Sequence, residues 1–168
     1  MRKSYLAALV AAPLVLTGAS GGAAQLSAQD RSFVDNAASG GLDEVQDAQL
    51  AEQKATSPDV KQFASQMITD HTQANQELMQ IAQSKGISLP KAPMRTEQRE
   101  TEKMKELSGS QFDRQYAKEQ VKDHQKTVAL FEKEADAGQD TELKAFAQKY
   151  LPKLQQHLQM AQSLAAKS

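Results

Sequence analysis

The stretch from Ser57 to Gly86 constrains the fold of this chain most, because both of its ends carry helix signals. Ser57 and Pro58 suit the cap and the first position of a helix, and Gly86 suits its stop. Apolar residues between these ends recur every three or four positions, which is helical and not strand-like spacing. This apolar stripe consists of Val60, Phe63, Met67, Ala74, Leu78 and Ile81. His71 falls inside the stripe, so we expect its ring to face a buried core.

The same periodicity predicts three more long helices, over residues 30–55, over residues 110–137 and from residue 140 onward. Asp30 is the expected cap of the first. Gly40-Gly41 lies inside that helix and predicts either a bend or the close approach of another backbone.

The connections between these helices indicate the topology. Short turns join the first helix to the second and the third to the fourth, which predicts two antiparallel hairpins. The connection over residues 87–109 is longer, with an extended part around Pro90 and Pro93 and a short charged helix from Thr96 to Leu107. It can travel the length of a bundle. We therefore predict one all-α domain over residues 30–166, a ferritin-like four-helix bundle of two hairpins joined by a long crossover.

The two hairpins also resemble each other in sequence. Residues 57–64 and 140–147 share a cap, an acid, an aliphatic residue and then the pattern Lys-x-Phe-Ala. In the register of the preceding helices, Glu44 falls opposite His124. This internal repeat supports a bundle built from two related hairpins.

Residues 1–28 have the features of a secretory signal peptide. Arg2 and Lys3 precede an apolar run from Tyr5 to Leu16, and small residues follow, with cleavage expected after Ala24 or after Ala28. The chain has no Cys, which excludes a lipid anchor on cysteine and any disulfide. We therefore expect a periplasmic or secreted mature protein.

Charge and hydropathy exclude two classes of partner. The chain carries 20 basic and 21 acidic residues, and the loss of Arg2 and Lys3 would make it slightly more acidic, which argues against a nucleic-acid partner. No apolar stretch is long enough for a transmembrane helix.

The three histidines of the chain are its most informative side chains. His71, His124 and His157 lie on the apolar stripes of three different helices, and each is roughly half way along, as is Glu44 on the remaining helix. Helix midpoints lie at one height in a bundle whichever way each helix runs. The sequence therefore predicts that one Glu and three His meet in the core.

Inward-pointing imidazoles and a carboxylate form a typical metal site of a helical bundle. We predict that His71, His124, His157 and Glu44 bind one transition-metal ion, with Zn, Cu, Fe and Ni all open. Glu52 is the alternative carboxylate from the first helix. Asp70 and Asp123 each precede a histidine but point about 100° away around the helix, so we interpret them as solvated acids.

Other readings of these residues stay open. A buried His layer can be purely structural, with each ring hydrogen-bonded to a carboxylate or a carbonyl. None of the three histidines has a Glu three positions before it, so a di-iron carboxylate centre is not expected. The chain also lacks a Cys nucleophile, a Gly-rich phosphate loop and a Gly-x-Ser-x-Gly elbow, so we do not expect an enzyme.

The sequence resembles the bacterial family of domain of unknown function 4142 over about residues 30–165. The motifs that carry the resemblance are Gly40-Gly41 with Glu44-Val45, Val60-Lys61-x-Phe63-Ala64 with Asp70-His71, Ser108-Gly109-x-x-Phe112-Asp113, His124, and Leu151-Pro152 with His157-Leu158. The resemblance implies an exported ferritin-like bundle and implies no biochemical role.

Three functional hypotheses follow. The first is an exported bundle that binds a metal ion, for sequestration or for protection against envelope stress. The second is a non-enzymatic envelope module that binds a protein or the cell wall, with a structural His layer. The third is a small-molecule pocket in the bundle core. Nothing in the sequence indicates an oligomeric state.

Overall fold

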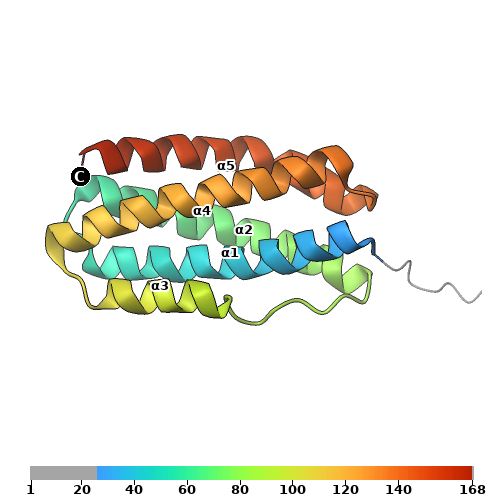
Figure 1. The fold of residues 1–168 in the computed structure, drawn as a ribbon, viewed down its shortest axis with the longest axis horizontal. Helices are drawn as coiled ribbons and strands as arrows, with labels where there is room; N and C mark the ends of the chain where they lie inside the picture. Colours follow the sequence, from blue (N-terminus) through green and yellow to red (C-terminus); the bar gives the residue numbers. More distant parts are fainter. Residues whose placement is uncertain (1–25, 168) are drawn as a thin grey trace, which may run out of the picture.

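The computed structural model describes residues 26–167, and these form the predicted all-α four-helix bundle. The long helices are α1 (Ala28–Lys54), α2 (Pro58–Ser84), α4 (Gly109–Ala137) and α5 (Thr141–Lys167). The crossover carries the short α3 (Arg95–Lys105), which lies along α1. In Figure 1, α1 and α5 run one way while α2 and α4 run the other way, with the crossover along one side. The fold prediction is confirmed.

The helix ends follow the expected signals with one correction. The Ser57 hydroxyl caps α2, the Asp140 carboxylate accepts from the backbone N–H of Leu143, and Gly86 has a φ of 66°, which stops α2. Asp30 does not cap α1. Ser27 does, accepting from the Asp30 backbone N–H, and its hydroxyl donates to the Asp30 carboxylate at 2.8 Å. The predicted signal peptide lies outside the described residues except for 26–28.

At the pair Gly40-Gly41, α2 approaches the backbone of α1 closely, and α1 continues through both residues. The Asn75 side-chain amide donates to the carbonyl of Gly41 at 2.8 Å. A Cβ at Gly41 would lie 2.0 Å from the Asn75 Oδ1, whereas a Cβ at Gly40 would meet no atom within 4 Å. Only the second of the two glycines is therefore required for the packing of α1 on α2.

The core of the bundle consists of two hydrophobic clusters. One contains Phe33, Phe131, Phe146 and Tyr150, and the other contains Phe63, Met67, Phe112 and Tyr116. Along every long helix, residues of one cluster precede those of the other, and a buried polar segment separates them. The separating residues are Glu44, His71, Gln120, His124 and His157. The bundle thus carries one polar layer at mid-height between two apolar halves.

Candidate metal centre

The three imidazole rings of His71, His124 and His157 meet in this polar layer. The ring centroids are 5.4–5.6 Å apart in all three pairs. The side chains come from α2, α4 and α5, and they are 6%, 0% and 1% exposed. One nitrogen of each ring lies within 4.8 Å of one nitrogen of each other ring. Counting residues from the helix ends thus predicted the convergence of the rings correctly.

Two of the rings are oriented by a hydrogen bond on one nitrogen. His124 donates from Nδ1 to the backbone carbonyl of Gln120 at 3.0 Å, one helical turn earlier. His157 donates from Nε2 to the Asp70 carboxylate at 2.9 Å. A neutral imidazole has one N–H, so these bonds leave the His124 Nε2 and the His157 Nδ1 as lone-pair acceptors.

One further nitrogen of each ring has no protein partner. Among residues 26–167, His71 Nε2, His124 Nε2 and His157 Nδ1 are fully buried and receive no hydrogen bond. Buried polar atoms are normally satisfied, so three unsatisfied nitrogens in one layer require an explanation. This pattern is typical of metal-binding histidines, whose second ring nitrogen is held by a carbonyl or a carboxylate.

Burial keeps the rings neutral. It lowers the pKa of His124 and of His157 to about 4, although hydrogen bonds to Gln120 and Asp70 act in the opposite direction. The pKa of His71 lies well below its usual value because of burial and because the other two rings would repel a third positive charge. At neutral pH the layer therefore presents uncharged imidazoles, the form that binds metals.

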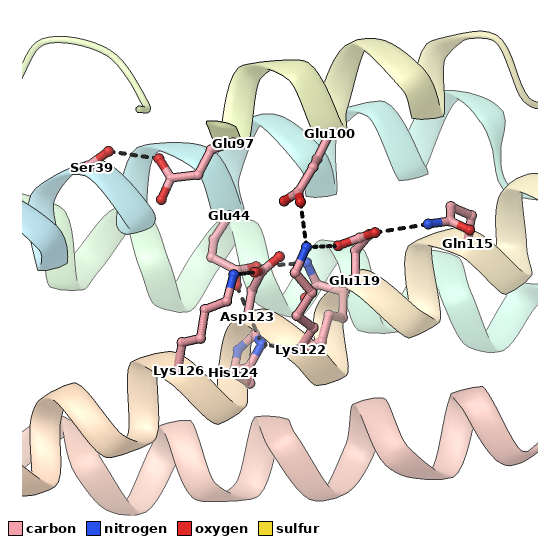
Figure 2. A network of polar contacts seen from close by, with 11 residues as sticks. Ser39, Glu44, Glu97, Glu100, Gln115, Glu119, Lys122, Asp123, His124 and Lys126 are labelled. Carbon is pink, nitrogen blue, oxygen red and sulfur yellow. Dashed lines mark hydrogen bonds and ion pairs between the residues drawn. The ribbon is translucent and has the colours of Figure 1, made fainter. Parts of the chain in front are cut away.

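Glu44 faces the core, and Glu52 is exposed. One Glu44 carboxyl oxygen lies 3.4 Å from the His124 Nδ1, and the other accepts from the Gln120 side-chain amide at 2.8 Å (Figure 2). Burial raises the pKa of Glu44 to about 8. Glu44 thus contacts the nitrogen of His124 that carries the proton, and its role as a metal ligand stays a prediction.

The interpretation of Asp70 as a solvated acid is wrong. Asp70 is 8% exposed, and its carboxylate accepts from His157 and, at 2.7 Å, from the Lys153 ammonium. Burial alone would raise the pKa of Asp70, but these two hydrogen bonds lower it below its usual value. Both donors come from α5, so the angular position of Asp70 on its own helix could not reveal them. Asp123 pairs with Lys126, but its side chain is only 18% exposed and burial raises its pKa, so it is not a fully solvated acid either.

A group of buried acids beside Glu44 also escaped the sequence reasoning. The Thr101 hydroxyl of α3 donates to Asp47 at 2.7 Å. Ser39 donates to Glu97 at 2.7 Å (Figure 2), so α3 covers this side of α1. Burial raises the pKa of Asp43 to about 8 and that of Asp47 to about 7. The four-residue spacing of the two acids on α1 was the only signal in the sequence.

A cavity of about 40 Å³ adjoins the rings of His71 and His157. Its lining includes Glu44, Asp70, His71 and His157. Apolar side chains that include Leu78, Phe131 and Phe146 form much of the remaining wall. A water molecule needs about 10–15 Å³ of such volume, so the cavity has room for about three non-hydrogen atoms of the size of a water oxygen.

The sequence comparison gives the family. Residues 16–164 match the family described as Domain of unknown function (DUF4142). The chain belongs to the DUF4142 family. No curated protein matched it.

Solved structures share the DUF4142 fold of this chain at low sequence identity. A DUF305 fragment from Deinococcus radiodurans has a TM-score of 0.74 and 15% identity, covering 85% of this chain and 99% of that one. CopM in its Ag-bound form has a TM-score of 0.68 and 19% identity, covering 82% and 96%. A conserved hypothetical protein from Mycobacterium tuberculosis has a TM-score of 0.63 and 11% identity, covering 82% and 91%. At such identities the likeness establishes the fold alone.

The described part of this DUF4142 chain contains no helix with the length and apolar character needed to cross a bilayer.

Proposed function

We propose that this DUF4142 protein binds one transition-metal ion between His71, His124 and His157. The observation that carries the proposal is that three buried rings converge and that each has a buried nitrogen without a protein partner. Three neutral imidazoles suit Zn, Cu, Fe and Ni. We further propose that the metal is held for sequestration or for protection against envelope stress, in a protein exported by residues 1–28.

A purely structural polar layer explains these nitrogens less well. In such a layer each buried acceptor has a donor, and the lone pairs of His124 Nε2 and His157 Nδ1 have none within residues 26–167. Within residues 26–167 no hydrogen bond holds the proton of His71 on Nε2, so this nitrogen is free to present a lone pair as well. One cation satisfies all three, because each lone pair can point to the same centre.

The outward contacts of the rings support the same proposal. The Gln120 carbonyl and the Asp70 carboxylate fix which nitrogen of His124 and of His157 is free. Such contacts orient a ligand ring before the metal arrives and make its free nitrogen more basic. CopM, a structural neighbour, is described in an Ag-bound form, so a bundle of this shape can bind a metal ion.

A metal titration of the purified protein from Gln25 onward tests the proposal. The chain has only three His and no Cys, so imidazole-based binding must use this layer. We expect one ion of Zn²⁺, Cu²⁺, Ni²⁺ or Fe²⁺ per chain and a rise in the melting temperature. An ion at a hundred times its Kd stabilises the fold by about 2.7 kcal/mol.

Two variants make the titration specific. His157→Ala should lose both the stoichiometric binding and the rise in melting temperature. Glu52→Gln changes an exposed acid of α1 and should keep both. If none of the four ions shifts the melting curve, the histidines form a structural layer and the proposal is wrong.

A further inference from the structure

We propose that the metal ion of this triad keeps one coordination position open to a small anion, which occupies the cavity beside the rings. This inference rests on the proposed metal binding. It assigns a ligand of at most about three non-hydrogen atoms, such as azide, to a cavity of about 40 Å³.

The arrangement of the helices leaves one side of the triad without a ring. The three nitrogens come from α2, α4 and α5. Where α1 lines the cavity, it presents Ala37, Gly40 and Gly41 together with Asn36 and Glu44. Ala37, Gly40 and Gly41 have little or no side chain, and this leaves space for the cavity. Three protein ligands with a vacant direction are the usual arrangement of a metal that takes an outside ligand.

The charge at the site favours an anion in that space. Imidazole ligands are neutral, so they leave a divalent ion with its full charge in a buried layer. The negative charge of Asp70 is already matched by Lys153 at 2.7 Å. Glu44 faces the far nitrogen of His124 and accepts from Gln120. An anionic fourth ligand would lower the net charge of the buried centre.

The rim of the cavity supplies a route from solvent. Asn36, Asn75, Thr127 and Lys153 line the cavity, and each is partly exposed. The inner wall includes Phe131, Phe146 and Leu154, which limit the size of the ligand. A small anion therefore has a polar entrance and an apolar pocket that excludes larger molecules.

Azide binding to the Cu²⁺-loaded protein tests the inference. Cu²⁺ is the divalent first-row ion that nitrogen sites bind most tightly. We expect one azide per copper, with a saturable azide-to-copper charge-transfer band and a changed electron paramagnetic resonance spectrum. If the copper-loaded protein gives no response to azide, the position is not open and the inference is wrong.

The controls separate this inference from the metal site itself. Ala37→Leu fills the cavity and should weaken azide binding at least tenfold while copper still binds. Ala129→Leu adds the same side chain at an exposed position of α4 and should change neither azide binding nor copper binding.

The Glu44→Gln variant tests whether Glu44 is the fourth ligand. If azide binds to copper in this variant but not in the wild type, the Glu44 carboxylate fills the fourth coordination position, which also overturns the inference. Failure of Cu²⁺ to bind would overturn the proposed function and this inference together.

Discussion

The Asp70 carboxylate lies 2.9 Å from the Nε2 of His157, and the Lys153 ammonium lies 2.7 Å from its other oxygen. This contact joins α2 to α5 and fixes the proton of His157 on Nε2. Asp70 therefore acts through His157 and has no expected contact with the metal.

Asp70→Asn should weaken metal binding by about 10–100-fold, because an amide holds the ring less firmly and makes its free nitrogen less basic. Isothermal titration with the tightest-binding ion measures the change. Asp136→Asn makes the same substitution at an exposed position and should leave the affinity unaltered. Equal affinities for the two variants would contradict the positioning role of Asp70.

The neutral rings should make the metal-free protein sensitive to acid. Burial lowers the folded-state pKa of all three rings, to about 4 for His124 and His157, so the unfolded state binds more protons between pH 6.5 and pH 4. The free energy of unfolding must then fall as the pH falls through this window, by about 1.4 kcal/mol per pH unit for each ring.

The His71→Gln variant isolates that contribution. Asp43, Glu44 and Asp47 have raised pKa values and act in the opposite direction, but they are present in both proteins. In urea unfolding with a chelator present, the variant should gain stability relative to the wild type as the pH falls from 6.5 to 4. A constant difference across this range would mean that His71 is not buried in its neutral form.

Glu134 should destabilise the fold at neutral and alkaline pH. It is 1% exposed, and burial and the neighbouring Asp30 raise its pKa to about 7. The folded state therefore binds more protons than the unfolded state between pH 4.5 and pH 7, and stability falls as the pH rises through that range.

The substitution Glu134→Gln should remove this loss of stability at high pH. At pH 8 the variant should exceed the wild type by about 2 kcal/mol in free energy of unfolding, and at pH 4.5 the difference should nearly vanish. Glu132→Gln, at an exposed position of the same helix, should match the wild type at both values. A Glu134→Gln variant no more stable than the wild type at pH 8 would be inconsistent with a carboxylate whose pKa is raised by burial and by Asp30.

Substitution by alanine should raise the stability of the fold at one of the two adjacent glycines of α1 and lower it at the other. Gly40→Ala places a methyl group where no atom lies within 4 Å and should stabilise the helix by up to about 1 kcal/mol. Gly41→Ala forces the Asn75 amide away and should cost about 1–3 kcal/mol. Chemical unfolding of both variants checks this, and equal effects would contradict the close packing of α1 on α2.

Apolar periodicity and helix-end signals were enough to predict the bundle, because both are local properties of a helix. The meeting of the three rings followed from counting residues to each helix midpoint. The partners of those rings could not be found in this way. Asp70 contacts His157 across 87 positions of sequence, and which residues meet across two helices depends on how the helices are rotated against each other. The cap of α1 was misplaced because Ser27 lies inside the predicted leader.

Anomalous diffraction from crystals of the Cu²⁺-loaded protein tests the central claim most directly. The account predicts one strong peak per chain at about 2.0–2.1 Å from His71 Nε2, His124 Nε2 and His157 Nδ1, a usual length for a bond from an imidazole nitrogen to a metal. A peak only at the protein surface, or no peak between the three rings, would contradict it.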